Sequence, residues 1–314
     1  MRVLFCGSGD FGIPSLNAIL ASRHEIAGVI TQPPRPAGRG GGLRPTAVAH
    51  RAAELGLEAA ALEDINDPES LRLIGDVAPD VIFVADFGQF IAGPVRAAAK
   101  HQAFNLHGSL LPALRGAAPV NWAIIKGHGV TGVTTFLLAD RMDAGPIYAC
   151  QPTEIRPDET ADQLRARLAE LGAGLVCRTL EMISQGSPPP VAQEESKATR
   201  VAKLRKCDGW IDFSADAVAI RNLVHGTWPW PGGQAVLADP GGRGELHVTI
   251  ARARTEEGGG GEPGTLDGDL TVATGKGRLR ILQIKPAGKR LMEWRDFVNG
   301  HRLREGCRFL TPRQ

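Results

Sequence analysis

The sequence predicts an α/β protein with two domains: a larger domain with a mostly parallel sheet, and a smaller C-terminal β-barrel. Short apolar runs alternate with helical patterns over residues 1–185. The composition then changes at Gln185-Gly186-Ser187-Pro188-Pro189-Pro190, and beyond it come short strand-like runs with glycine-rich turns. A chain of 314 residues, 43% of them hydrophobic, is long enough to form two such cores.

Short apolar runs in the first part are interpreted as buried strands, at 3–6, 26–31, 81–85 and 103–107. A β-branched and apolar run at 132–138 continues this sheet. Helices are predicted over 13–22 and 46–55, from Asp67-Pro68 onward, and over 160–183. Thr46 and Asp67 are suitable N-cap residues, and the last helix is amphipathic because leucines recur on one of its faces.

A polar stretch without apolar periodicity separates the two domains, and we interpret residues 189–205 as a linker. Residues 1–188 then form the first domain and residues 206–314 the second. In the second domain, four runs between glycine-rich turns are predicted as strands of a small OB-like barrel, at 233–237, 246–251, 270–273 and 279–285.

Charge is divided unevenly along the chain, although the net charge is only +2. Residues 1–195 carry 16 basic and 21 acidic side chains, whereas residues 196–314 carry 20 and 13. A basic surplus in the C-terminal part is typical of a surface that meets a polyanion, and a merely solvated basic surface is the alternative.

Neither membrane insertion nor secretion is expected. No run approaches the roughly 18 apolar residues that cross a bilayer. The N-terminus leads directly into a strand-like segment, without the apolar stretch and cleavage site of a signal peptide. We therefore expect a cytoplasmic protein with no membrane partner. The five cysteines are scattered and odd in number, so no disulfide framework or structural zinc is expected.

A glycine-rich segment lies between the first predicted strand and helix. Gly7-Ser8-Gly9-Asp10-Phe11-Gly12 matches G-x-G-x-x-G, the fingerprint of Rossmann-like dinucleotide sites. That fingerprint also expects an acidic residue at the end of the second strand, where this chain has Thr31-Gln32-Pro33-Pro34. We therefore favour, over a NAD site, a tight strand-to-helix turn whose amides are free for another ligand.

Two polar residues at the end of a predicted strand mark a candidate site. Asn105 and His107 are two residues apart, so their side chains point to the same side of the sheet. They lie at the carboxyl edge, where open α/β sheets bind ligands. A lone histidine there would more often be a core residue, but the Asn-x-His pair, followed by a Gly/Pro-rich turn, favours a site.

Three motifs follow one another here: Asn105-Leu106-His107-Gly108-Ser109-Leu110-Leu111-Pro112, Arg115-Gly116-Ala117-Ala118-Pro119 and Asp143-Ala144-Gly145. Together they resemble the signature of the enzymes that transfer a formyl group from 10-formyltetrahydrofolate to an amine. Within that family, the segments at 31–40 and 283–289 resemble those of the methionyl-tRNA formyltransferases. The resemblance covers essentially the whole chain, including the order of the domains.

The resemblance implies a Rossmann-like catalytic domain followed by an OB-like domain that binds tRNA. The implied reaction transfers the formyl group of 10-formyltetrahydrofolate to the α-amino group of methionine on initiator Met-tRNA. Asn105, His107 and Asp143 would form the catalytic trio, with no metal, and we expect a monomer. These residue types suit the chemistry, since amide and imidazolium donors stabilise an oxyanion and His107 and Asp143 can move protons.

The same resemblance implies where the two substrates bind. The folate would lie against the loop 85–91, the turn 109–112 and the segment before Asp143. This gives the folate-binding residues Phe87, Gly88, Ser109, Leu110, Leu111, Pro112 and Asp140. The tRNA would meet the loop 33–45 through Arg35, Arg39 and Arg44. The sequence leaves open whether the Leu111–Pro112 bond is cis or trans.

Two positions depart from the family pattern. Phe87 stands where tyrosine is common, and Arg141 stands where a small residue is usual. An arginine at the second position is familiar in formyltransferases that act on amino sugars, so an amino-sugar nucleotide is the alternative acceptor. A nicotinamide dehydrogenase is disfavoured by the missing acid, and a purely RNA-binding module leaves the trio unexplained.

Overall fold

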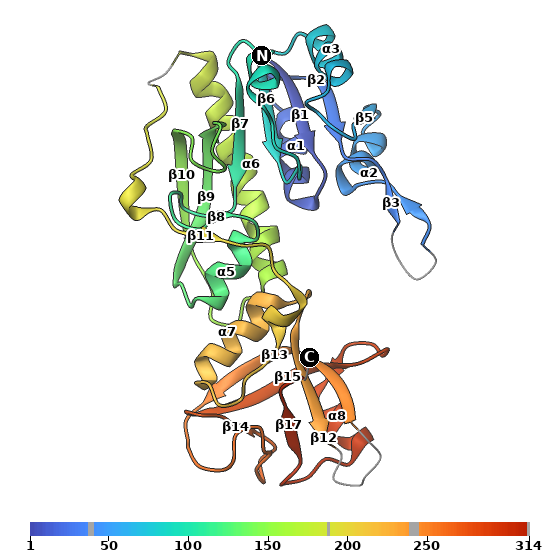
Figure 1. The fold of residues 1–314 in the computed structure, drawn as a ribbon, viewed down its shortest axis with the longest axis vertical. Coiled ribbons are helices and arrows are strands. Elements are labelled where there is room, and N and C mark those ends of the chain that lie inside the picture. Colours follow the sequence, from blue (N-terminus) through green and yellow to red (C-terminus); the bar gives the residue numbers. More distant parts are fainter. Residues whose placement is uncertain (37–40, 187–188, 239–244, 313–314) are drawn as a thin grey trace. The chain divides into compact units, whose positions relative to one another are not determined.

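The computed structural model describes residues 1–36, 41–186, 189–238 and 245–312. The chain forms two compact units (Figure 1). The first contains Met1–Gly116, Gly132–Thr153 and Arg165–Arg200, and the second contains Ala117–Thr131, Glu154–Leu164 and Val201–Gln314. Each unit therefore combines stretches that are far apart in the sequence. In the described ranges, no helix is both long and apolar enough to cross a membrane.

The first unit is built on a seven-stranded sheet in the order β10-β9-β7-β6-β1-β2-β5. Its strands are β1 (Arg2–Gly7), β2 (Glu25–Thr31), β5 (Ala59–Ala61), β6 (Val81–Ala85), β7 (Ala103–His107), β9 (Val130–Leu137) and β10 (Ile147–Glu154). The strands from β5 to β7 are parallel, which confirms the predicted mostly parallel sheet. Strand β9 is the exception, since it pairs antiparallel with β7. It begins at the C-terminal end of β7 and runs back toward the start of that strand.

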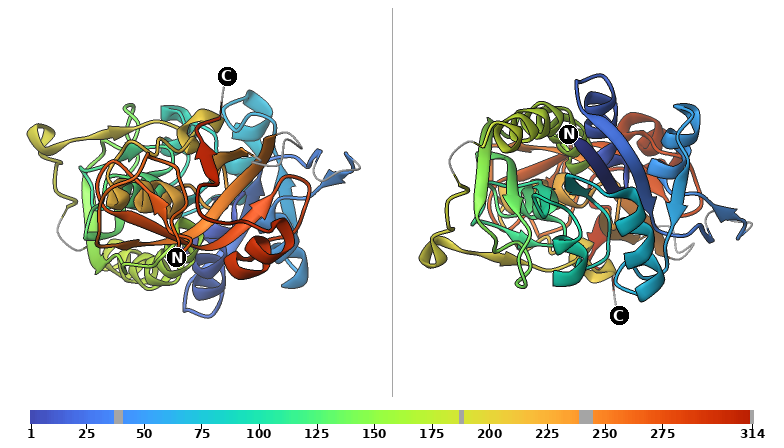
Figure 2. Two further views of the ribbon diagram at one scale, coloured as in Figure 1. Left: turned by 90° about the horizontal axis from the view of Figure 1, so that it is seen from below. Right: turned by 90° about the horizontal axis from the view of Figure 1, so that it is seen from above.

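Helices cover both faces of this sheet. They are α1 (Ile13–Leu20), α2 (Ala47–Glu54), α3 (Pro68–Val77), α4 (Gly93–Ala97) and α6 (Ala161–Ser184). Ala103 belongs to the apolar cluster that includes residues of α3 and α4. Helix α6 lies against the opposite face (Figure 2). There a Cβ atom on Gly172 would lie 2.5 Å from the Leu106 side chain. Because side chains alternate along a strand, Asn105 and His107 share the face of Ala103.

Short elements complete the first part of the chain. There are two further two-stranded sheets. One pairs β3 (Arg35–Pro36) with β4 (Leu43–Arg44), and the other pairs β8 (Arg115–Gly116) with β11 (Arg200–Val201). Turns of 3₁₀-helix are η1 (Asp10–Gly12), η2 (Glu195–Lys197) and η3 (Lys206–Gly209). The two predicted N-caps are confirmed, since the side chain of Thr46 accepts from the Ala49 amide and that of Asp67 from the Ser70 amide.

The glycine-rich segment is a tight turn, as favoured, but two of its amides are not free. The amides of Ser8 and Gly9 both donate to the carbonyl of Asp86 at 3.2 Å. A Cβ atom on Gly9 would lie 1.6 Å from the carboxylate of Asp86. Strands β1 and β6 are neighbours in the sheet, so the turn after β1 lies beside the loop after β6. The missing side chain of Gly9 allows the two to pack closely. The amides of Ser8 and Gly9 are therefore not available to another ligand.

The second unit contains a curled antiparallel sheet in the order β14-β15-β13-β12-β17. Its strands are β12 (Gly233–Ala238), β13 (Glu245–Glu256), β14 (Val272–Ala273), β15 (Arg278–Pro286) and β17 (Arg308–Leu310), and β16 (Met292–Glu293) pairs with β15. Isolated bridges join Thr265 to Arg308 and Leu266 to Val272, so residues 265–266 connect the two edge strands. The predicted fold class, an α/β domain followed by a smaller curled β domain, is confirmed.

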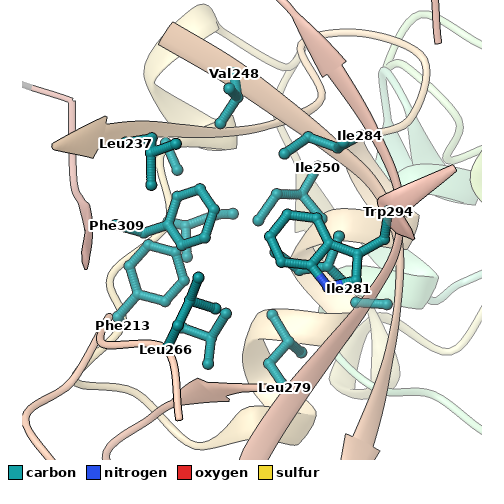
Figure 3. Packing of buried hydrophobic residues seen from close by; sticks show 14 of the residues in the cluster. Phe213, Leu237, Val248, Ile250, Leu266, Leu279, Ile281, Ile284, Trp294 and Phe309 are labelled. Carbon is teal, nitrogen blue, oxygen red and sulfur yellow. The ribbon is translucent and has the colours of Figure 1, made fainter. Parts of the chain in front are cut away.

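Aromatic side chains pack together within the largely aliphatic core of the second unit (Figure 3). The ring of Phe309 contacts Phe213 and Trp294, and Trp294 also stacks on Phe297. Helices α7 (Ala217–Thr227) and α8 (Trp294–His301) supply part of this core, and α5 (Pro119–Ile125) packs against α7. These three short helices were not predicted.

Contact between α5 and α7 depends on Gly226, which leads to a prediction about stability. A Cβ atom there would lie 2.9 Å from both the Asn121 carbonyl oxygen and the Ile125 amide nitrogen, which are backbone atoms. We expect Gly226→Ala to lower the free energy of unfolding by roughly 1–3 kcal/mol. Gly174 in α6 has no neighbour within 4 Å, so Gly174→Ala should raise it by about 0.5–1 kcal/mol. Urea unfolding followed by circular dichroism measures both, and equal effects would contradict the packing argument.

Candidate active site at the end of strand β7

Asn105 lies in the middle of the sheet, on β7. It is the register partner of Val84 on β6 and of Phe136 on β9. Its side chain is half-buried and makes no hydrogen bond to any residue that the structure describes. A primary amide in this position offers two donors and an acceptor to a bound molecule.

His107 is buried at the end of the same strand, and its side chain is 8% exposed. Its Nε2 atom lies 3.0 Å from the carbonyl oxygen of Leu114. A carbonyl oxygen only accepts, so this bond assigns the ring proton to Nε2. Nδ1 is then the nitrogen that can take up or release a proton, and it faces Oδ2 of Asp143 at 3.9 Å. Phe136 contacts the ring edge-to-face and restricts its rotation.

Asp143 reaches His107 from a loop that folds back over the sheet. Strand β9 ends beside the start of β7, where the Leu138 amide donates to the carbonyl of Ala103. The following loop must therefore return toward the opposite end of β7. There the Gly116 amide donates to Oδ2 of Asp143 at 2.7 Å, and this side chain is 11% exposed. Asp143 has a φ of 54°, in the left-handed region.

The turn after β7 is held by hydrogen bonds within the turn and to Thr134 of β9. The Ser109 hydroxyl donates to the carbonyl of Ala113 at 2.6 Å. Thr134 of β9 donates to the carbonyl of Ser109 and accepts from the Leu111 amide, at 2.7 and 3.1 Å. The Leu111–Pro112 bond is cis. Ser109 is one of the predicted folate-binding residues, and its hydroxyl is thus used within the turn.

The loop after β6 adjoins the same edge, because β6 pairs with β7. Phe87 is buried, and its carbonyl accepts from the Ser8 hydroxyl at 3.1 Å and the Gln32 side chain at 2.9 Å. Gly88 has a φ of 81°, and a Cβ atom there would lie 2.5 Å from Nε2 of Gln32. Only glycine suits this position.

Asp140 is connected to the same loop by an arginine that the sequence did not single out. Arg96 forms an ion pair with the exposed Asp140 and donates to the carbonyl of Ile91 at 3.0 Å. Its side chain is 11% exposed. Arg96 therefore joins two of the segments predicted to hold the folate. The signal in the sequence was a single arginine among small and apolar residues at 91–99.

The predicted tRNA-binding arginines lie elsewhere. Arg35 and Arg44 are exposed and face each other across the β3–β4 pair. In the described part of the chain, no hydrogen bond or ion pair joins either of them to Asn105, His107 or Asp143. Arg39 lies outside the described residues.

Comparison with known families decides what kind of protein carries this site. Residues 1–180 match the formyl transferase family, and residues 203–302 match the family of formyl transferase C-terminal domains. The chain belongs to the formyl transferase family. A similar curated relative is a methionyl-tRNA formyltransferase of Solibacter usitatus, which is 38% identical over 308 residues, covering 97% of this chain and 97% of the relative.

Solved structures with a similar fold include proteins of much lower sequence identity. HypX from Aquifex aeolicus, in complex with tetrahydrofolic acid, has a TM-score of 0.62 at 19% identity, over 96% of this chain and 47% of that chain. An N-formyltransferase from Helicobacter canadensis, with folinic acid and dTDP-3-aminofucose, has a TM-score of 0.64 at 14% identity. The latter match covers 90% of this chain and 98% of that chain. At these identities the likeness concerns the fold.

Two buried threonines of β9 allow a matched test of the turn. Thr134 makes the two hydrogen bonds described above, whereas the buried hydroxyl of Thr131 has no partner among the described residues. We expect Thr134→Val to lower the free energy of unfolding by about 1–3 kcal/mol, because it leaves buried groups unpaired. Thr131→Val should leave it unchanged or raise it. Thermal and urea unfolding measure both variants, and a neutral Thr134→Val would show that the turn does not need this bridge.

Proposed function

We propose that the protein transfers the formyl group of 10-formyltetrahydrofolate to the α-amino group of methionine on initiator Met-tRNA. The observation that carries this proposal is that His107 and Asp143 face each other beside the Asn105 amide, which has no hydrogen-bond partner among the described residues. The name of the similar relative, a methionyl-tRNA formyltransferase at 38% identity, supports the same acceptor.

Asn105 would stabilise the charge that develops during transfer. When an amine attacks the formyl carbon, negative charge builds up on the formyl oxygen. The Asn105 side chain has no hydrogen bond to a described residue to give up, so its NH₂ group is available to donate to that oxygen. Its fixed place on a central strand provides the donor before the reaction begins.

His107 would exchange the proton. With Nε2 held by the Leu114 carbonyl, the ring accepts and releases a proton at Nδ1. As an imidazolium it also becomes a second donor near the developing charge. Protons then pass from the attacking nitrogen to the departing folate nitrogen through this one ring position.

Asp143 would orient His107 and favour its charged form. A carboxylate near an imidazole holds the ring in one orientation and offsets the positive charge of the imidazolium when it forms. The Gly116 amide donates to Oδ2, the same oxygen that faces Nδ1 of His107, and holds the carboxylate in place. Together, Asn105, His107 and Asp143 would supply the donors and the proton carrier that formyl transfer needs.

The formyl donor would lie against the loop after β6 and the turn after β7. Phe87, Gly88, Leu110, Leu111 and Pro112 would contact it largely through backbone groups, with Ser109 shaping the turn and Asp140 at the rim. The folates in the two structural neighbours, tetrahydrofolic acid and folinic acid, support this ligand class. A bound 10-formyltetrahydrofolate supplies the formyl carbon; the residues position it.

The acceptor would be held by basic side chains, with Arg35, Arg39 and Arg44 contacting phosphates. Such contacts position a nucleic acid and add salt-dependent affinity. The basic surplus of residues 196–314 supports the same partner. We propose a monomer with no membrane partner.

Arg141, which raised the alternative of an amino-sugar acceptor, is paired with Glu195 at 3.1 Å. This exposed ion pair gives the arginine a partner within the protein. The H. canadensis structure contains dTDP-3-aminofucose, but at 14% identity it is a likeness of fold. An amino-sugar acceptor therefore remains only as an outcome of the acceptor test below.

Replacing the trio tests the proposed chemistry. Asn105→Ala, His107→Ala and Asp143→Ala should each lower the single-turnover rate of formyl transfer by roughly 10² or more, since each removes a donor or proton carrier. Far-UV and near-UV circular dichroism check that the fold is kept. A near-normal rate for His107→Ala would overturn the assignment.

Replacing the loop arginines tests the acceptor. Arg35→Ala, Arg39→Ala and Arg44→Ala should weaken the use of Met-tRNA but not of a minimal amine acceptor, and tRNA binding should fall steeply with added salt. Arg72→Ala, which removes an exposed arginine of α3, is the matched control. Formylation of Met-tRNA and of a 4-amino-sugar nucleotide is measured in parallel. A protein that formylates only the sugar, with no response to the three changes, would contradict the proposed acceptor.

A further inference from the structure

Gln193, in the polar stretch that follows α6, contacts the loop of Asp143. Its side-chain nitrogen Nε2 donates to the main-chain carbonyl of Asp143 at 2.8 Å and to that of Gly145 at 2.7 Å. Both hydrogens of the amide are thus used on the one loop that must fold back over the sheet. Sequence patterns alone assigned this stretch to a linker.

Arg115 fixes the orientation of that amide. The guanidinium is buried, with 2% of the side chain exposed, and donates from Nε and Nη2 to Oε1 of Gln193 at 3.0 and 2.8 Å. It also donates to both carboxylate oxygens of Glu195, at 2.9 and 3.2 Å, and these bonds hold the pKa of Glu195 below its usual range. Because guanidinium groups only donate, Oε1 of Gln193 must face Arg115, and Nε2 must face the loop.

The loop needs such support because its own geometry is demanding. Asp143 adopts a positive φ, which is uncommon for residues other than glycine. At Gly145 a Cβ atom would lie 1.7 Å from the Leu137 carbonyl oxygen, so the loop runs tightly along the end of β9. Among the described residues, the Gly116 amide holds the carboxylate of Asp143, and Gln193 holds its carbonyl.

We propose that Gln193 is a positioning residue for formyl transfer, which holds the main chain of Asp143 so that its carboxylate faces His107. Arg115 contributes by orienting the Gln193 amide. The inference rests on the proposed function, in which Asp143 acts on His107. Gln193 itself takes no part in proton transfer.

Two substitutions separate this role from simple packing. Gln193→Ala removes the amide, whereas Gln193→Glu keeps an acceptor for Arg115 and replaces the donor to Asp143 and Gly145 by a carboxylate oxygen, which repels their carbonyl oxygens. Both should lower kcat by about 10-fold to 100-fold, since a misplacement of about 1 Å costs catalysis on this order. KM for the folate and for Met-tRNA should change less than about twofold. Gln185→Glu, the same change at an exposed glutamine outside the network, is the matched control and should be unchanged.

A double-mutant cycle with Asp143→Asn identifies the residue through which Gln193 acts. If Gln193 works by positioning Asp143, the double variant Asp143→Asn with Gln193→Ala should be no more than about twofold slower than Asp143→Asn alone. Multiplied losses would show that Gln193 acts independently of Asp143 and would overturn the inference. So would a Gln193→Glu protein as fast as the parent, because the acceptors alone would then suffice.

The two proposals fail in different ways. If Asp143→Asn is slow and Gln193→Ala is normal, the positioning role falls and the proposed function stands. If Asp143→Asn is as fast as the parent, the proposed catalytic role of Asp143 falls, and the positioning role with it. Circular dichroism and the melting temperature of each variant separate a slow folded enzyme from an unfolded one. Should Gln193→Ala not fold, Gln193→Glu, which keeps the contact with Arg115, carries the test alone.

Discussion

Strand β9 runs antiparallel to β7, and this direction governs how the candidate site is assembled. In a parallel arrangement, the loop after β9 would emerge at the same edge as His107. Here β9 ends beside Ala103, at the start of β7, so the loop has to cross the sheet face before Asp143 can meet His107. The Asp143 carboxylate therefore lies on a loop over the sheet face and not on a strand. Its position depends on hydrogen bonds from outside the sheet, such as that of the Gly116 amide.

A second constraint comes from the crowded ends of β1 and β6. The turn at Gly9 and the loop at Asp86 bind each other through backbone hydrogen bonds, so neither can shift alone. Phe87 is held next to them by Ser8 and Gln32. A motif that resembles a dinucleotide fingerprint thus serves here to set the shape of a neighbouring loop. The fingerprint describes a turn geometry, and the chemistry depends on what packs against that turn.

The parts of this fold that the sequence predicted were those with strong local signals. Apolar runs located the central strands, and Thr46 capped its helix as expected because capping is a short-range interaction. Asn105 and His107 were recognised because two polar residues interrupt an apolar strand. Helix α8 was missed because it is short, and the edge strand β10 because its exposed residues lack a buried strand's apolar run. The contacts of Gln193 join residues about 50 positions apart, and no local pattern encodes such a pairing.

The contact between Gln193 and the Asp143 loop also bears on where the catalytic part of the chain ends. A fragment that stops where α6 ends keeps the whole seven-stranded sheet and all three candidate catalytic side chains. It lacks the amide that braces the aspartate, so a well-folded fragment of this kind would be a poor enzyme. In a domain exchange, a junction between α6 and Gln193 would replace this amide, and its effect on the chemistry would be that of substituting Gln193. The residues that form the sheet and α6 thus end at Ser184, whereas the residues that the proposed reaction needs extend to Gln193.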